Sequence, residues 1–409
     1  MATFSNTPRP AYVYEAATDQ WIPVGFGPHT HAVTDVTNAF NTTTVTTKGD
    51  LVVAAGSNNI TRLAAGNSGE QLVADSSTST GLRYQGNNAA GKNAVINGDC
   101  LVAQRGTSAL TLSATAQYPV DRFFAVGHSG ATAQQITSIS NTSFKNAVRV
   151  QRTAANSTTT DLSFTQTFET NTSIPFQGKA VTISFYARAG ANFSPTSSTL
   201  TSRVYTGTGT DQGGFGFSWT GTANPINQGN TLTTSWQRFT ATGTISSSAT
   251  QIQEFFFCTP TGTAGAADYF DITGVQLEAG SVATAFQTAT GTIQGELAAC
   301  QRYYYRLTAD TAYSQFTNYA PAFSTTNVTV QVPTRVTMRV KPSSVDFSTV
   351  TLADGTNFVT ASTVAVGTHA SASVPLIDIG ATGLTATTRS YSLWANNSTS
   401  AYLGISAEL

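Results

Sequence analysis

The stretch VTISFYARA, residues 181–189, alternates apolar and polar side chains from one end to the other. Side chains of an extended strand point alternately to its two sides, so Val181, Ile183 and Phe185 would face a core while the polar residues face away from it. Comparable stretches, separated by turn residues, recur from about residue 91 onward. Regular short strands of this kind are typical of antiparallel sandwiches. We therefore expect a mainly β chain with an antiparallel β-sandwich over residues 91–290.

Only 10% of the residues are charged, against about 25% in an ordinary soluble domain. Lys and Arg number 20 and Asp and Glu 21, so no surface is basic enough to hold a phosphate backbone, and we expect no nucleic-acid partner. No stretch approaches the ~18 consecutive apolar residues of a membrane span, and the first ten residues hold no apolar run, so neither membrane insertion nor a secretory signal is expected. Three widely spaced cysteines, Cys100, Cys258 and Cys300, predict buried free thiols.

Two short segments before the first sandwich echo each other. GDLVVA at residues 49–54 is followed by GEQLVA at residues 69–74, with Gly- and Asn-rich turns between them. One short strand per repeat buries almost nothing in one chain, so we expect residues 41–90 to form an intertwined β shaft of a homotrimer. The alternative is a flexible linker. Residues 1–40 are too few to fold alone and predict a segment that attaches to a partner surface.

A helical spacing of apolar side chains predicts a helix over residues 293–305, within a connector that spans residues 291–310. The side chains expected on its buried face are Ile293, Leu297, Cys300 and Tyr304. Strand patterns return over residues 311–409, RVTMRV at residues 335–340 among them, and predict a second β-sandwich domain. The last residues, LGISAEL, also alternate, which predicts a C-terminus tied to that domain.

Several motifs occur together in a fixed order. They are NAVINGDCLVAQRG (93–106), YPVDRFF (118–124), VTISFYARA (181–189), ITGVQLEAGSVATAF (272–286) and ELAACQRYYYR (296–306). This order resembles a module of bacteriophage tail fibres and receptor-binding proteins, which looks like the jelly-roll of carbohydrate-binding modules. Cys100 stands where that module commonly has Phe, and Phe123 where it commonly has Trp, both modest changes inside a core.

The resemblance covers about residues 90–409, and the closing SAEL also matches the tails of such proteins. Shorter matches, KGDLVVAAGSNNITRLAAG (48–66) and GPHTHAVTDV (27–36), resemble fibre-shaft and attachment segments. The resemblance implies a virion protein of the phage tail, assembled in the host cytoplasm. Its N-terminus would bind other tail or baseplate proteins, and its C-terminal β domains would recognise a host cell-surface polysaccharide.

Two alternatives to an adhesive fibre stay open. A tailspike-type glycan depolymerase would need a pair of carboxylates a few ångströms apart, which sequence spacing cannot show. A purely structural neck or collar fibre would have no receptor role. The chain has no G-x-S-x-G, P-loop or H-E-x-x-H motif, and GHSG at residues 127–130 has the wrong spacing for a nucleophile elbow. We therefore expect binding and not catalysis.

Half of the four histidines lie two residues apart, at His29 and His31. In a strand both would point to the same side, and three chains would bring six imidazoles around one axis. Imidazole suits iron, nickel and zinc, so the pair predicts a transition-metal site across a trimer axis. Similar pairs hold iron in the fibre tips that the sequence resembles. The alternative is two polar residues of an attachment loop.

A structural calcium is the second metal prediction, and it comes from the resemblance. In related jelly-rolls a calcium joins the first and last strands, and Asp99 and Asp271 occupy the corresponding motifs. Calcium needs about six to eight oxygen ligands, so other groups would have to contribute. The alternative is turn capping by Asp99 and an ion pair of Glu278 with Arg105 or Arg122.

Aromatic side chains in polar, Gly-rich surroundings are the candidate glycan contacts, since sugars stack their C–H faces on flat rings. The residues in question are Tyr205, Trp219, Tyr391 and Trp394. The alternative for each ring is packing in a core. RYYYR, residues 302–306, could stack its arginines on its tyrosines. We expect this cluster to pack one domain on the next, or one chain on another, and the alternative is that it binds a ligand.

Overall fold

The computed structural model describes residues 11–15, 17–24, 45–57, 59–66, 70–86, 91–140, 143–385 and 389–409. The chain divides into two compact units, Met1–Gly86 and Asn87–Leu409. Among the described residues, every helix is too short or too polar to span a membrane.

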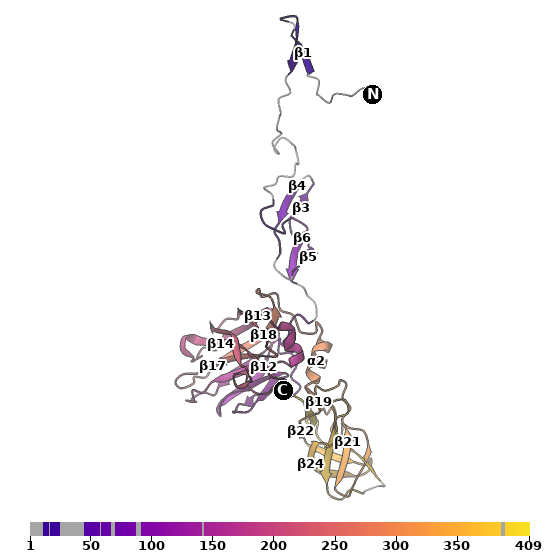
Figure 1. The fold of residues 1–409 in the computed structure, drawn as a ribbon. Coiled ribbons are helices and arrows are strands. Elements are labelled where there is room, and N and C mark those ends of the chain that lie inside the picture. Colours follow the sequence, from indigo (N-terminus) through magenta and orange to yellow (C-terminus); the bar gives the residue numbers. More distant parts are fainter. Residues whose placement is uncertain are drawn as a thin grey trace, which may run out of the picture. The chain divides into compact units, whose positions relative to one another are not determined.

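The first unit consists of antiparallel hairpins (Figure 1). Their strands are β1 (Ala11–Glu15) with β2 (Gln20–Val24), β3 (Leu51–Gly56) with β4 (Asn59–Leu63), and β5 (Glu70–Ala74) with β6 (Leu82–Gly86). Each sequence repeat is therefore a two-stranded hairpin and not one isolated strand. Asp50 ties the second hairpin together, since its carboxylate accepts hydrogen bonds from the Thr47 backbone N–H at 2.8 Å and from Arg62 Nε at 2.7 Å.

The side chains of these hairpins whose burial is described form no buried core. None of the residues whose burial the structure describes in the first unit is buried. Ile60 and Leu72 keep 45% and 43% of their surface exposed. A two-stranded hairpin without a covered apolar face is only marginally stable in water, so the described part of this unit lacks the burial that stabilises a domain.

The second unit begins with two six-stranded antiparallel sheets. The first sheet has the order β16 (Gln237–Thr244), β13 (Ala180–Ala189), β18 (Tyr269–Ala279), β11 (Asn146–Arg152), β10 (Ala131–Thr137), β7 (Leu110–Thr111). The second sheet has the order β15 (Ala223–Thr231), β14 (Thr199–Gly207), β17 (Gln251–Cys258), β12 (Leu162–Thr167), β9 (Phe123–Val126), β8 (Gln117–Val120). Short turns in the connections are α1 (Thr170–Ser173), η2 (Ile174–Phe176), η3 (Thr196–Ser198) and η4 (Gly216–Ser218).

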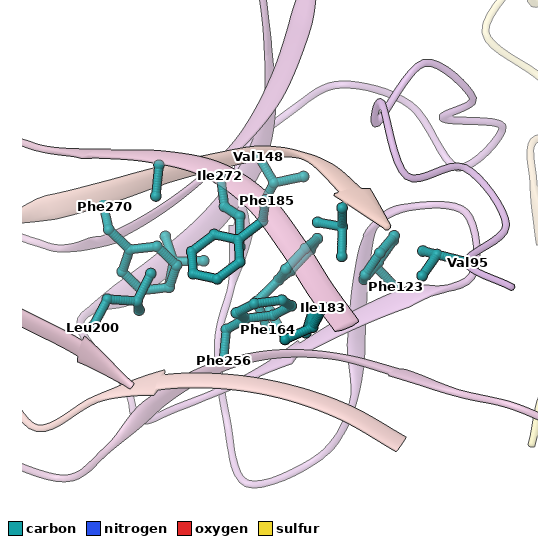
Figure 2. Packing of buried hydrophobic residues seen from close by; sticks show 14 of the residues in the cluster. Val95, Phe123, Val148, Phe164, Ile183, Phe185, Leu200, Phe256, Phe270 and Ile272 are labelled. Atoms are coloured by element: carbon teal, nitrogen blue, oxygen red, sulfur yellow. The ribbon is translucent and has the colours of Figure 1, made fainter. Parts of the chain in front are cut away.

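One apolar core joins the two sheets, as Figure 2 shows. Val181, Ile183 and Phe185 of β13 are fully buried in it, which confirms the predicted strand and its apolar face. Phe185 meets Phe256 of the second sheet edge-on, with ring centroids 4.8 Å apart. The prediction of an antiparallel β-sandwich in this part of the chain is confirmed.

A second set of sheets follows, with its own core (Figure 1). Its strands in chain order are β19 (Tyr304–Thr308), β20 (Ala320–Pro321), β21 (Asn327–Gln331), β22 (Ser344–Ser348), β23 (Val350–Ala353), β24 (Phe358–Val366), β25 (Leu376–Ala381), β26 (Ser390–Ala395) and β27 (Tyr402–Ser406). They form a three-stranded sheet, β19-β27-β22, and a six-stranded sheet, β20-β26-β23-β24-β25-β21. No strand covers residues 335–340, where one was predicted; instead Arg339 donates hydrogen bonds to the carbonyls of Ala407 and Glu408.

Helix α2 (Ile293–Gln301) precedes these strands and corrects the predicted helical face. The helix ends before Tyr304, which begins β19. Ile293 and Leu297 are 66% and 37% exposed, whereas the acidic Glu296 is buried. Its carboxylate accepts hydrogen bonds from backbone N–H groups, that of Asn97 among them at 2.8 Å. The hydrogen bonds of Glu296, and not the spacing of apolar side chains, therefore decide which side of the helix faces the first sandwich.

Arginines of the first sandwich meet the end of the chain. Arg122 donates to the Glu408 carboxylate, and Arg105 lies 3.5 Å from it. The predicted pair of Glu278 with either arginine is wrong, because Glu278 lies instead 3.3 Å from Lys92. The arginines belong to the QRG and DRF motifs and Glu408 to SAEL, so these motifs, far apart in sequence, hold the two sandwiches together.

The RYYYR segment contributes to the same interface. Arg122 stacks over the Tyr303 ring and Arg105 over the Tyr304 ring, each 3.5 Å from the ring centroid. Arg302 forms an ion pair of 2.7 Å with Glu169 of the first sandwich. The prediction that this segment packs one domain on the next is confirmed within the chain. The three cysteines are buried and unpaired, as predicted.

Candidate functional site

A hollow of about 470 Å³ lies on the outer face of the first sheet, the face turned away from the core. Tyr186 and Arg188 reach it from β13, since they alternate with the core residues of that strand. The connection between β10 and β11 and the segment before β16 supply the remaining walls. Their lining residues are Ser140, Ser143, Thr234, Ser235 and Trp236.

A β-bulge sets the position of Tyr186. The pairing of β13 with β18 shifts register between Ser184 and Tyr186, and Gly274 of β18 lies in the shifted stretch with φ +61°. A Cβ on Gly274 would come within 2.4 Å of the Phe144 ring and 3.0 Å of the Tyr186 ring. The missing side chain therefore lets the Phe144 ring pack against Tyr186, with centroids 5.1 Å apart.

Three charged side chains stand side by side next to the hollow. Asp271 of β18 pairs across the sheet with Arg149 of β11 and Arg188 of β13. Its carboxylate is fully buried and accepts from Arg149 Nε at 2.8 Å and Nη2 at 3.0 Å, and from Arg188 Nε at 2.8 Å. Burial would lower the pKa of Arg149, but the hydrogen bond and charge of Asp271 outweigh it and raise that pKa.

Aromatic rings lie beside both arginines. The Arg149 guanidinium is 3.6 Å from the Tyr269 ring centroid, and that of Arg188 is 5.1 Å from the Trp236 ring centroid. Such contacts add to the ion pairs in holding the guanidinium groups in place. The Trp236 indole N–H has no hydrogen-bond partner among the described residues.

The lining suits a polyhydroxylated ligand. Serine and threonine hydroxyls both donate and accept hydrogen bonds, and Arg188 donates several. Tyr186 and Trp236 offer flat apolar faces with polar edges. The volume lies within the range of about 300–1,000 Å³ that small-ligand sites occupy. Among the described lining residues none is a carboxylate, and a glycoside-hydrolysing site needs a pair of them.

Two predicted glycan contacts lie away from the first sheet, Tyr205 on β14 of the second sheet and Trp219 in the connection between β14 and β15. Tyr205 and Trp219 are only 6% and 5% exposed. Tyr205 packs against Phe255, with ring centroids 5.7 Å apart, and the Trp219 indole donates to the Gly213 carbonyl at 3.0 Å. Neither residue lines the hollow on the first sheet. Both rings are buried by local packing, but neither belongs to the apolar core between the two sheets.

The other two predicted contacts lie in the second sandwich. Tyr391 is buried in its core, and its hydroxyl accepts from the Thr385 backbone N–H at 3.0 Å. Trp394, three positions on, is partly exposed, and its ring centroid lies 6.4 Å from that of Phe358. A strand turns residues three apart to opposite sides, so the two rings cannot form one platform.

The metal predictions stay predictions. His29 and His31 lie outside the described residues. Asp271 is held by two arginines, as above, whereas Asp99 Oδ1 is buried with no partner among the described residues. Burial, and then the charge of Glu296, raise the pKa of Asp99. Within the described residues, no three His, Cys, Asp or Glu side chains form a group that could hold a metal.

Sequence reasoning missed most of the residues that line the hollow. Arg188 was interpreted as a structural ion pair of the sandwich, with glycan contact as the alternative. Tyr186 stood out only as part of the polar face of the predicted strand 181–189, where an outward-facing aromatic ring was the available signal. Trp236 lies 50 positions beyond Tyr186. Strand pairing of β13 with β16 brings that segment next to the strand, and no local pattern announces such a pairing.

No protein-family model matches the sequence, and no curated protein matches it. Structural neighbours are carbohydrate-binding domains and a phage tailspike domain. A CBM4 module is 19% identical over 36% of this chain and 87% of its own, with a TM-score of 0.24. The CBM22-1 xylan-binding domain of Paenibacillus barcinonensis Xyn10C is 13% identical over 42% of this chain and 100% of its own, at 0.28. The enzymatically active domain of bacteriophage CBA120 tailspike protein 4 is 13% identical over 46% of this chain and 21% of its own, at 0.28.

Proposed function

We propose that the chain is a bacteriophage tail fibre protein whose first sandwich, a jelly-roll-like module, binds a glycan of the host cell surface. The observation that carries the binding role is the hollow on the first sheet, where Tyr186 and Trp236 lie among hydroxyl groups. Its lining holds no carboxylate. Binding without cleavage is the function that this chemistry supports, in preference to a depolymerase.

The first unit supports the proposal of a homotrimer. Its described residues include apolar side chains that one copy leaves uncovered, Ile60 and Leu72 most of all. Burial of apolar surface against two further copies would supply the stabilisation that a hairpin lacks. Three glycan sites on one fibre would then turn weak single contacts into firm attachment. A flexible linker is the competing proposal for this unit.

The virion role rests on the sequence motifs. The N-terminal segment would attach the fibre to tail or baseplate proteins, and the chain would assemble in the host cytoplasm before it joins the virion. A neck or collar fibre would share these features but would not bind cells. Adsorption separates the two: the purified full-length protein should bind host cells and slow infection when added first.

Loss of glycan binding on a ring substitution tests the site. Trp236→Ala should abolish binding of host polysaccharide to the full-length protein, measured by isothermal titration. Phe217→Ala is the matched control, since this ring of η4 is 56% exposed, packs against Tyr205 of the second sheet and does not line the hollow. Trp394→Ala tests, by the same titration, whether the partly exposed ring of the second sandwich contributes to glycan binding. Unchanged binding by the Trp236 variant would exclude the hollow as the site.

Two further measurements test the remaining parts of the proposal. The solution mass of the intact protein should be three times the chain mass, and a stable monomer would contradict the shaft. Release of reducing ends from the polysaccharide should stay at background, and steady release would favour the depolymerase.

A further inference from the structure

The outer face of the first sheet carries more positive than negative charge. Arg149 and Arg188 share the one carboxylate of Asp271. Arg238 of β16, the cross-strand neighbour of Tyr186, is exposed and donates to Ser184 Oγ at 3.1 Å, not to a carboxylate. Glu278 of the same face pairs with Lys92, and this described ion pair adds no net charge. In a chain with nearly equal numbers of acidic and basic residues, this excess is local to the face that holds the hollow.

Among the described residues that line the hollow, Arg188 is the one with a charged side chain. Its Nε atom donates to Asp271, and the structure gives its two Nη atoms no acceptor among the described residues. A guanidinium presents its N–H groups in a planar fork that matches an oxyanion. The ion pair with Asp271 therefore fixes the orientation of Arg188 while it leaves the outer part of the fork available to a ligand.

The fork is preorganised. Asp271 is fully buried and is held from its other side by Arg149, so it cannot swing away with Arg188. The Trp236 ring lies beside the guanidinium, with 5.1 Å between them. A rigid donor loses little conformational entropy when a ligand binds, which favours selectivity for the matching group.

We propose that the hollow selects an acidic glycan, whose carboxylate or sulfate binds Arg188 while a sugar ring stacks on Trp236 or Tyr186. This inference rests on the proposed function and adds the class of sugar. A neutral glycan would desolvate the Nη groups of Arg188 without giving them an acceptor of opposite charge. An acidic one neutralises part of the excess charge of the face.

A panel of matched oligosaccharides tests this inference with the full-length protein. Each acidic member, either uronate or sulfated, is paired with its neutral counterpart of the same length, the methyl ester or the unsulfated sugar. At least one acidic member should bind about tenfold or more tightly than its counterpart, and 0.5 M NaCl should remove most of this difference. The two acidic sets show which oxyanion is preferred.

Two arginine variants separate recognition from structure. Arg188→Gln and Arg149→Gln each leave Asp271 with one arginine, but only Arg188 lines the hollow. Arg188→Gln should reduce acidic-glycan affinity about tenfold or more and should remove most of the difference between acidic and neutral members of the panel. Arg149→Gln should change either affinity less than about threefold. Thermal unfolding of both variants checks that they fold alike.

The outcomes distinguish this inference from the proposed function. Equal binding of acidic and neutral members, abolished by Trp236→Ala, would overturn the charge selectivity and keep the glycan site. An equal loss in the Arg149 and Arg188 variants would also overturn it, since the effect would then be structural. Absence of binding to every member of the panel and to host polysaccharide would overturn both.

Discussion

The ion pair between Arg122 and Glu408, which joins the two sandwiches, gives a prediction about the stability of the protein. Glu408 is nearly buried, as is its partner Arg122, so each charge depends on the other. Glu408→Ala leaves the Arg122 guanidinium buried without a counter-ion, with only the Thr167 carbonyl at 2.7 Å and the Tyr303 ring as partners. Removal of one partner of a buried pair typically costs about 3–5 kcal/mol. We expect the free energy of unfolding to fall by about that amount.

Urea unfolding followed by tryptophan fluorescence measures this loss. Asp310→Ala is the control, because Asp310 is exposed in the same sandwich and its removal should change stability by less than about 0.5 kcal/mol. Glu408→Gln keeps the shape and should lose about 1.5–3 kcal/mol, the worth of a charged hydrogen bond.

A double variant shows whether the loss of stability comes from the unpaired Arg122 charge or from lost packing of the Glu408 side chain. If the cost of Glu408→Ala comes from the uncompensated guanidinium, then adding Arg122→Met should restore much of the stability, because an apolar side chain of similar length needs no counter-ion. A Glu408 variant within 1 kcal/mol of the parent would refute the reasoning. So would a double variant that is no more stable than Glu408→Ala.

Further predictions concern the bulge and two buried acids. Gly274→Ala should lower stability by about 1–3 kcal/mol, because φ is +61° and the new Cβ would meet Phe144, and it should weaken glycan binding by displacing Tyr186; calorimetry measures both. Burial raises the pKa of Asp121 to about 7. The folded chain therefore keeps a proton that the unfolded chain releases above about pH 4, so stability falls as pH rises from about 4 to about 7, and Asp121→Asn should flatten this part of the stability–pH curve. Burial also raises the pKa of Glu254 well above its usual range, and neither carboxyl oxygen has a partner among the described residues. Glu254→Gln should raise the unfolding free energy more at pH 7 than at pH 4, because the unfolded chain gains stability by ionising Glu254 at pH 7 and a glutamine cannot ionise.

Much of the architecture could be predicted from local patterns. The alternation of Val181, Ile183 and Phe185 predicted a strand with one buried face, and that face is fully buried. Short strands separated by turns predicted an antiparallel sandwich. The predicted helical face failed at Ile293 and Leu297, because hydrogen bonds to the Glu296 carboxylate, and not apolar spacing, decide which side of that helix is buried.

The candidate site was harder to predict, because its residues are distant in sequence. Tyr205 and Trp219 looked like surface rings from their Gly-rich surroundings, yet each is buried. Gly-rich sequence indicates a turn but does not say which neighbouring rings the turn covers. Conversely, Trp236 lines the hollow only because the strand that follows it, β16, pairs with β13.

By itself, the sequence determined the strand-rich character of the chain, the buried faces of its strands and the free cysteines, because these depend on residue type and short-range periodicity. The tertiary structure alone decided which charges pair and which rings line the hollow. Arg149, Asp271 and Arg188 lie on three strands, and only the register of the sheet places them side by side. The physical reason is that strand register is set by the burial of all apolar faces together, which no local segment encodes.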